Sequence, residues 1–442
     1  MAFKPFKVFD DFAIPSFGLI LVIFAGLLWF IYTSVVPSFD PVFNIIFSLS
    51  PIWFPFILII VLWKVWIEYI RAKFINSQEH VLLDIKLPRE ISRSPQAMET
   101  LLNNLHIGIG EANFIDRYIS GKVRPWYSLE MVSLGGDIHF FIWTRKFLQG
   151  VVEAQIYGQY PTVEIHEAKE DYAKKLRYNP DQYGVWGCDF TLTGKDAYPI
   201  KTYIDYGLDK DPKEEFKIDP MAGFFEYLGQ IGPDEQIWFQ IMIRVNKDKL
   251  REDRKYKGGT LFTKTTSWQE EAIEEIEKIR EEATPERPGA EFPGFPNPTP
   301  GQTDRIKALE RSISKAGFDV GMRGIYIAKS DKFNATNIVA LTASLKQLNS
   351  GDLNGIRPIR WFIDFSYPWQ DFRGKKKEAC RRDIIDAYRR RSFFHAPYKS
   401  PPFVFNTEEL ATIFHFPGSV VQTPTLGRVQ SAKGEAPSNL PR

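Results

Sequence analysis

The residues best suited to chemistry in this chain are nine basic side chains that lie close together after Phe372. They are Arg373, Lys375, Lys376, Lys377, Arg381, Arg382, Arg389, Arg390 and Arg391. Such a cluster can bind phosphate groups, either on the anionic inner leaflet of a membrane or on a nucleic acid. The same side chains could instead pair with acidic residues of a neighbouring domain. Charge alone does not select a partner, so the sequence leaves these alternatives open.

The sequence has no pattern typical of a catalytic or cofactor site. Gly194-Lys195 lacks the remaining residues of a P-loop, and Gly108-x-Gly110 lacks the third glycine of a dinucleotide-binding turn. The six histidines show neither the HExxH spacing nor the CxxC companions that indicate a zinc site. A Gly-x-Ser-x-Gly nucleophile elbow is also missing. We therefore expect a protein that is not an enzyme and that binds no cofactor and no metal.

The overall composition is that of a folded protein kept under reducing conditions. Lysine and arginine number 56, and aspartate and glutamate number 54, which gives a formal net charge of +2. A chain so close to neutral is not an obvious binder of nucleic acid, so any basic character must be local. The two cysteines, Cys188 and Cys380, form neither a CxxC pair nor a disulfide framework. This fits a reducing compartment.

Two long uncharged apolar runs open the chain, at residues 12–39 and 41–63. Each is long enough to cross the hydrocarbon core of a bilayer, which is about 30 Å thick. Two adjacent runs of this length are hard to bury in a soluble protein, which disfavours a pair of core helices. Basic residues flank the pair on both outer sides: Lys4, Lys7, Lys64, Arg71 and Lys73. By the positive-inside rule, residues 1–75 form a two-span transmembrane hairpin with both termini in the cytoplasm.

Residues 76–170 alternate between short strands and amphipathic helices. Strands are predicted at residues 80–87, 129–134, 138–144 and 162–166, and helices after Ser94-Pro95 and at residues 146–159. Gly135-Gly136 supplies the turn between the two middle strands. The order β-α-β-β-α-β predicts a ferredoxin-like domain, with one antiparallel sheet and two helices on one face.

Residues 171–365 repeat this order, so the fold class we predict is α+β with tandem ferredoxin-like domains. We expect a strand or hairpin at 189–203, a helix from Asp219-Pro220, and a strand at 235–245. A strand at 318–328, a helix at 334–348 and a strand at 356–362 complete the second domain.

A long insertion at about 246–303 interrupts the second predicted domain. It holds a charged helix with a capping box at Ser267 and Glu270, and an i,i+4 pair between Glu274 and Lys278. Prolines and glycines from Pro285 onward predict an irregular loop that reaches Gly301, most simply a mobile linker.

Residues 366–442 combine the basic cluster, part of which lies on a short amphipathic helix, with a tail rich in proline. Four apolar residues in the tail form a predicted docking surface: Leu410, Ile413, Phe414 and Phe416. An exposed patch of this kind is an association surface or an aggregation hazard. We therefore expect it to pack on the second ferredoxin-like domain of its own chain. The chain from about residue 423 should stay extended.

Two parts of the chain resemble a known family. The first includes Ile138-His-Phe-Phe-Ile-Trp-Thr144 with the residues that follow it to Ile165. The second includes Asp386-Ala-Tyr-Arg-Arg-Arg391, Phe403-Val-Phe-Asn-Thr-Glu-Glu-Leu410 and Thr423-Pro-Thr-Leu426. Both are similar to the membrane-anchored N-terminal region of type IV secretion or conjugation ATPases, related to coupling proteins and HerA-type translocases.

In that family the tail leads into a RecA-like motor domain, and this sequence ends at Arg442, where the motor would begin. No catalytic residue of the family can be carried over. The resemblance implies a non-catalytic inner-membrane platform that anchors or regulates a separate motor ATPase. The expected partners are a lipid bilayer and that motor, with a homo-oligomer or a nucleic acid as further possibilities. The alternatives are a self-contained structural subunit of a cell-envelope complex and an enzyme of unrecognised chemistry.

Overall fold

The computed structural model describes residues 26, 47–88, 93–111, 113–209, 219–247, 267–284, 296–361, 367, 369–371, 374–417 and 428–429. The chain divides into two compact units. The first unit comprises residues 1–77, 110–123 and 362–383, and the second comprises residues 78–109, 124–361 and 384–442.

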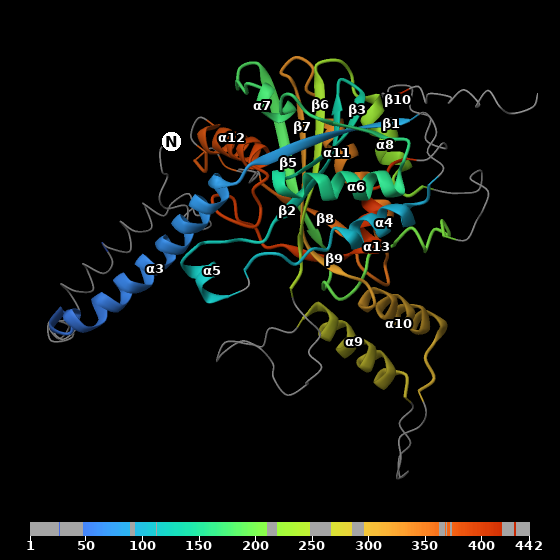
Figure 1. Ribbon diagram of the computed structural model, residues 1–442, viewed down its shortest axis with the longest axis horizontal. Helices are drawn as coiled ribbons and strands as arrows, with labels where there is room; N and C mark the ends of the chain where they lie inside the picture. The colour runs from blue at the N-terminus through green and yellow to red at the C-terminus, as the bar shows by residue number, and fades with distance from the viewer. Residues whose placement is uncertain are drawn as a thin grey trace, which may run out of the picture. The chain divides into compact units, whose positions relative to one another are not determined.

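The second unit is built on one large, mainly antiparallel sheet (Figure 1). Its first four strands are β1 (His80–Pro88), β2 (Trp126–Leu134), β3 (Asp137–Arg145) and β4 (Glu164–Glu167). They pair antiparallel in the order β4-β1-β3-β2. Positive φ angles at Gly135 and Gly136, of 66° and 98°, make the predicted turn between β2 and β3.

Two helices cover one face of these strands: α4 (Pro95–Asn104) and α6 (Gln149–Gln159). Ser94 and Pro95 begin α4 as predicted, with the proline at the first helical turn, where its missing N–H costs nothing. A 3₁₀ turn, η1 (Lys146–Leu148), precedes α6, and the short helix α7 (Tyr172–Lys175) follows β4. The predicted β-α-β-β-α-β element order of this region is therefore present.

The next four strands repeat the same spatial order. They are β5 (Tyr183–Leu192), β6 (Glu235–Val245), β7 (Gly317–Lys329) and β8 (Ile356–Arg360), and they pair antiparallel as β8-β5-β7-β6. The accompanying helices are α8 (Ala222–Gln230) and α11 (Ala335–Ala343), followed by the 3₁₀ turn η3 (Lys346–Leu348).

The two sets of strands join edge to edge. β2 pairs antiparallel with β6 along its whole length, from Trp126 opposite Arg244 to Leu134 opposite Gln236. The resulting order is β10-β1-β3-β2-β6-β7-β5-β8, with β4 also on β1 and β9 on β7. Side chains from both sets contribute to one apolar core. A mixed α+β fold with a large antiparallel sheet is thus confirmed, and the sheet runs unbroken across the predicted domain boundary.

The strand or hairpin expected at residues 189–203 is present only as far as Leu192. β5 starts earlier, at Tyr183, and leaves the sheet after Leu192. The following turns are fixed by the side chain of Asn354, which accepts a hydrogen bond from Gly194 N at 2.8 Å and donates to Tyr198 O at 2.9 Å. A side chain 160 positions away in sequence thus determines this local structure.

The described part of the insertion is a pair of helices. They are α9 (Trp268–Glu282) and α10 (Pro300–Ile313), and they bury a small apolar cluster between them. The capping box at Ser267 and Glu270 is confirmed. Lys278 pairs with Glu275 at 2.8 Å and not with Glu274 as predicted, so the i,i+3 neighbour provides the partner.

The predicted irregular loop does not reach Gly301, because helix α10 begins at Pro300. Thr299 caps α10, and its side chain accepts a hydrogen bond from Gln302 N. Pro300 occupies the first helical turn, where proline is favoured instead of disruptive. Residues 285–295 of the predicted loop lie outside the described residues.

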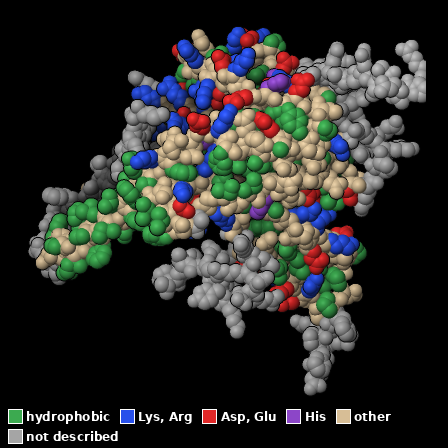
Figure 2. Space-filling view, in the orientation of Figure 1, with side chains coloured by type: hydrophobic (Ala, Val, Ile, Leu, Met, Phe, Trp, Pro, Cys, Tyr) green, Lys and Arg blue, Asp and Glu red, His purple; other side chains and the backbone are tan. Residues whose placement is uncertain are grey.

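The first unit contains α3 (Ser50–Ser77), the short helix α5 (Phe114–Tyr118) and the first part of α12 (Lys375–Arg389). α3 is long and apolar enough to cross a membrane, and its most apolar window is entirely unburied. Figure 2 shows its hydrophobic side chains gathered on the surface. The helix continues beyond Trp63, where the predicted span ends. The other predicted span, residues 12–39, lies outside the described residues except for Gly26.

The end of the chain adds three short elements to the second unit. β9 (Phe403–Asn406) pairs with the start of β7, and α13 (Thr407–Ile413) follows directly. β10 (Arg428–Val429) lies parallel to the end of β1, with Arg428 opposite Leu87. At these two residues the extended tail expected after residue 423 is part of the sheet.

Candidate docking site

The four apolar residues of the predicted docking surface are buried inside the second unit. Leu410, Ile413 and Phe414 expose none of their surface, and Phe416 exposes 1%. The ring of Phe416 lies 5.5 Å from that of Phe140, on β3, and 4.8 Å from that of Tyr160. The tail is therefore an integral part of the core of the second unit.

The tail packs on both predicted domains and not on the second one alone. α13 packs on α4, and Phe140 belongs to β3, so elements of the first predicted domain supply much of the contact. The second predicted domain contributes Phe225, on α8, whose ring lies 6.3 Å from His415. The expected contact with the second domain is present, since β9 pairs with β7 and Thr412 accepts a hydrogen bond from Tyr203 N at 3.0 Å. The contacts of the tail with α4 and β3 of the first domain were not expected.

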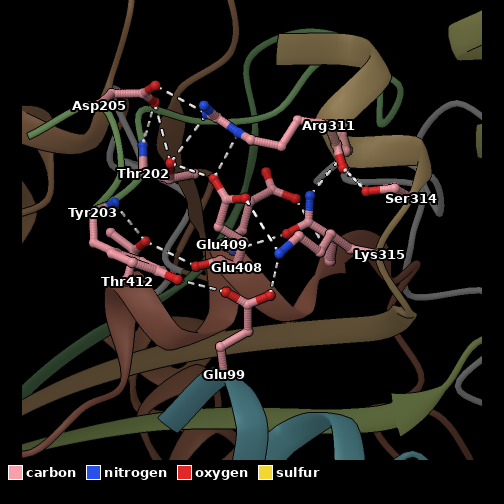
Figure 3. Close-up of polar contacts among 12 residues, drawn as sticks. Glu99, Thr202, Tyr203, Asp205, Arg311, Ser314, Lys315, Glu408, Glu409 and Thr412 are labelled. Atoms are coloured by element: carbon pink, nitrogen blue, oxygen red, sulfur yellow. Dashed lines mark hydrogen bonds and ion pairs between the residues drawn. The ribbon is translucent and has the colours of Figure 1, made fainter. Parts of the chain in front are cut away.

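A cluster of charged residues surrounds the first turn of α13, and we name it the α13 charge cluster: Glu99, Asp205, Arg311, Lys315 and Glu408 (Figure 3). Arg311 lies 3.1 Å from Glu408 and 2.9 Å from Asp205, and Lys315 lies 2.5 Å from Glu99. The cations come from α10 and the segment after it. The carboxylates come from α4, α13 and the turns after β5.

Hydrogen bonds complete this arrangement. Thr202 donates its hydroxyl proton to Glu408 at 2.5 Å, and Tyr203 donates to Glu99 at 2.6 Å. Burial raises the pKa of Glu408, whereas Thr202, Arg311 and Lys315 oppose that rise. The cluster thus joins α4, α10, α13 and the turns after β5 through ion pairs and hydrogen bonds.

Glu409 is a second buried acid of α13, with 3% of its surface exposed. Its two carboxyl oxygens accept hydrogen bonds from Ile200 N and Asn406 N, each at 2.9 Å. Asn406 in turn caps the helix by accepting from Glu409 N at 2.8 Å. Burial raises the pKa of Glu409 to about 8, in spite of the two backbone donors. This carboxyl group fixes the start of α13 to the turn at Ile200.

A buried His415 and Asp219 pair closes the other end of the tail. The two side chains lie 3.2 Å apart, and His415 also contacts Ala411 O at 3.0 Å. Burial alone would lower the pKa of His415, but the Asp219 carboxylate raises it above its usual value. The imidazole is therefore held by the fold and is not exposed for proton transfer.

The nine basic residues predicted as one contact surface separate into two groups. Arg391 is 1% exposed, which excludes it from any contact with a membrane or a nucleic acid. Its guanidinium pairs with Glu130, at 2.9 Å from Nε, and with Asp171. Burial lowers the pKa of Arg391, but these two carboxylates raise it far more. For this residue, the ion-pairing alternative is the correct one.

Arg389 is also used inside the second unit, where it donates to Ala173 O at 2.8 Å and to Leu176 O. The remaining described members of the cluster face outward to different degrees. Lys375, Lys376, Lys377, Arg382 and Arg390 are exposed, and Arg381 is half-buried. Arg382 and Arg390 pair with Glu378 and Asp386 on the helix itself. Arg373 lies outside the described residues.

The α13 charge cluster was not predicted from the sequence. Its members lie on segments far apart in the chain. Taken alone, each charged residue would be predicted to lie exposed on the surface. The one local signal is the spacing of Asn406 and Glu409, which matches a capping box and marks the start of α13. In the described ranges, no three His, Cys, Asp or Glu side chains are grouped in a way that could hold a metal ion.

The fold and the buried tail define the class of protein. It is an α+β protein with one large, mainly antiparallel sheet and an exposed apolar helix long enough to span a membrane. Residues 72–428 match the model of a protein family described as a domain of unknown function, DUF8128, and the chain belongs to this family. No curated protein matches the chain. The family match begins inside α3 and ends at β10.

Proposed function

We propose that the protein is a non-catalytic platform in the cell inner membrane that anchors or regulates a separate motor ATPase of the type IV secretion or DNA-translocation kind. The observation that carries the anchoring role is the exposure of the apolar side chains of α3, in a chain whose α+β body buries its own apolar side chains. A long exposed apolar surface of this kind marks a site of membrane or protein contact. The motor enters through the sequence resemblance alone.

The anchor has two spans in this proposal, with both termini in the cytoplasm. The support is the second uncharged run at residues 12–39 and the basic residues outside the pair. The large body then faces the cytoplasm, where reducing conditions fit Cys188 and Cys380, which form no disulfide bond.

The body consists, in our interpretation, of tandem ferredoxin-like domains. Each set of four strands has the spatial order fourth, first, third, second, as the split β-α-β plan requires. Antiparallel pairing of β2 with β6 joins the two second strands. The two domains then act as one rigid support.

The buried charges favour a structural role over a catalytic one. Arg391 forms ion pairs with Glu130 and Asp171 inside the body. The members of the α13 charge cluster likewise pair with one another. The exposed basic residues of α12 are a better basis for contact with anionic lipid. Lys375, Lys376 and Lys377 belong to the same compact unit as α3. Figure 2 shows basic side chains at the surface over α12.

The test is reconstitution of the full chain in nanodiscs that contain phosphatidylglycerol, with and without the RecA-like ATPase encoded nearest to it. We expect no ATP hydrolysis by the chain alone, and a complex with the ATPase that survives gel filtration. A chain that hydrolyses ATP by itself would refute the non-catalytic role. If the ATPase does not bind and the chain self-associates, the alternative of a structural envelope subunit replaces the platform.

A further inference from the structure

The short helix α5 and the turn after it lie directly against α3. Asn113 caps α5 by accepting a hydrogen bond from Asp116 N at 2.8 Å. The segment ends at Gly121, which has a φ angle of 63°. Both helices belong to the first compact unit.

Three contacts fix the segment on α3. The ring of Tyr118 stacks on Trp63 at 5.6 Å, and the Tyr118 carbonyl accepts a hydrogen bond from Trp66 Nε1 at 3.1 Å. Gly121 approaches the α3 backbone so closely that an added Cβ would lie 2.5 Å from Ile70 C and O. α5 is therefore attached along one side of α3, from Trp63 to Ile70.

This attachment lies where the apolar part of α3 ends. Trp63 is the last residue of the uncharged run, and Lys64 follows it. The seven steps of α-helix from Trp63 to Ile70 span roughly 10 Å. With residues 41–63 in a bilayer, this length of α3 lies at the membrane–water interface, where tryptophan and tyrosine are enriched.

Three apolar side chains of the α5 segment remain exposed although the segment lies on α3. Phe114, Ile115 and Ile119 are 62%, 58% and 59% exposed. The polar residues of the segment are engaged elsewhere: Asp116 pairs with Lys122 at 2.9 Å, and Arg117 donates to Glu111 O at 3.1 Å. Three large apolar side chains thus stay exposed on a segment whose charged side chains Asp116 and Arg117 are held by other contacts.

We infer that α5 is an interfacial membrane anchor, and that Phe114, Ile115 and Ile119 insert into the boundary between lipid headgroups and acyl chains. This inference rests on the proposed placement of α3 in a bilayer. Lipid is the occupant because the apolar surface of α5 continues the exposed apolar surface of α3 at the same level. An apolar helix face that lies flat in the interface buries its side chains to a depth of about 5–10 Å. α5 would then set the depth at which α3 sits.

The test measures lipid exposure at single nitroxide labels in the full chain, reconstituted in vesicles of phosphatidylcholine and phosphatidylglycerol. The background carries Cys188→Ala and Cys380→Ser. The probe site is Ile115→Cys, with Leu58→Cys on α3 as the bilayer reference. Val339→Cys is the matched control, since Val339 is 63% exposed on α11 of the second unit. Collision with oxygen reports lipid, and collision with a water-soluble nickel chelate reports water.

We expect the ratio of oxygen to nickel accessibility at position 115 to be severalfold higher than at 339 and to approach that at 58. Adding Phe114→Asn and Ile119→Asn should lower the ratio at 115, because the segment then leaves the interface. If 115 behaves like 339 while 58 reports lipid, the inference fails and the membrane anchor stands. An immobile label at 115, shielded from both reagents, would show that protein covers α5, which also overturns it. If 58 reports water, the proposed anchor itself is wrong.

Discussion

At the scale of single residues, Arg391 was predicted to lie on a contact surface, but its side chain is buried and forms ion pairs in the core. It follows the end of α12 with a φ angle of 48°, and its carbonyl accepts a hydrogen bond from Trp126 Nε1 at 3.1 Å. The guanidinium is thereby directed between Glu130 and Asp171. The sequence shows that residue 391 is basic. Whether its side chain is buried or exposed depends on partners that lie 220 and 261 positions away in the chain.

Replacing Arg391 tests this structural role. Arg391→Met leaves the buried carboxylate of Glu130 without its cation, and breaking a buried pair in this way costs roughly 3–5 kcal/mol. We expect the free energy of unfolding to fall by that amount, measured by urea unfolding in detergent micelles and followed by tryptophan fluorescence. Arg382→Met is the control. Its side chain is 64% exposed, and loss of a surface pair costs at most about 1 kcal/mol. Equal losses in the two variants would contradict the assignment.

Glu409 makes the stability of the body depend on pH. The pKa of this buried acid is about 8 in the folded chain, compared with an ordinary value of 4.5. Between these values, the folded state keeps a proton that the unfolded state has released. The free energy of unfolding therefore falls as the pH rises, by up to ~1.4 kcal/mol per pH unit.

The variant Glu409→Gln removes this titration. Its free energy of unfolding should be lower than that of the wild type at pH 5, and the difference should shrink towards pH 8. The test is this difference, because His415, whose pKa is raised, affects the wild-type slope in the same direction. Glu167→Gln, at a side chain that is 54% exposed, should leave the slope unchanged. A constant difference across the range would refute the titration.

At the scale of elements, the tail is the clearest case in which a late segment completes the core. β9 and α13 add Phe405, Leu410 and Phe414 to the core of the sheet's helical face, and all three are fully buried. Their removal would expose the apolar surfaces of α4 and β3. The α13 charge cluster would lose Glu408 and leave Arg311 with Asp205 alone.

Two truncations separate the roles of the tail. Ending the chain after Tyr398 should cause aggregation and lower the yield of monodisperse protein in gel filtration, because β9 and α13 are lost. Ending it after Val421 keeps both elements and removes only β10 from the edge of β1. This second variant should unfold within a few degrees of the full chain, while binding to the motor ATPase should be lost. Binding that survives both truncations would remove the tail from the proposed motor contact.

The bounds of three strands were predicted to within one residue from local sequence patterns. β6 was predicted at its observed bounds, and β3 and β7 to within one residue at each end, because alternating apolar side chains and flanking turn residues identify them. α10 was missed because Pro300 and Gly301 are loop residues in most contexts, and only Thr299 marks the cap. β9 and β10 are four and two residues long, and pairing with distant strands defines them.

At the scale of the whole molecule, the β2 and β6 junction explains why two predicted domains share one sheet. Nearly every residue of β2 is buried, on both faces, and so is the centre of β6. Strands that end a sheet are usually shortened, charged or covered, since open edges promote aggregation. The burial of both faces of these two strands fits a central position in the sheet. The identity of the partner strand depends on pairing across more than a hundred residues, which local sequence does not specify.

The topology of the anchor is the prediction that decides where this joined sheet works. If residues 12–39 and 41–63 both span the bilayer, the link between them lies outside the cell membrane, and Asn76 at the end of α3 lies in the cytoplasm. A membrane-impermeant maleimide should therefore label Ser38→Cys in intact spheroplasts. It should label Asn76→Cys only after the membrane is opened, with Cys188→Ala and Cys380→Ser in both chains. A single span would instead place the N-terminus outside, so Lys4→Cys in intact spheroplasts is the control that separates the two arrangements. Labelling of Asn76→Cys from outside would reverse the orientation, and the body could then not meet a cytoplasmic motor at all.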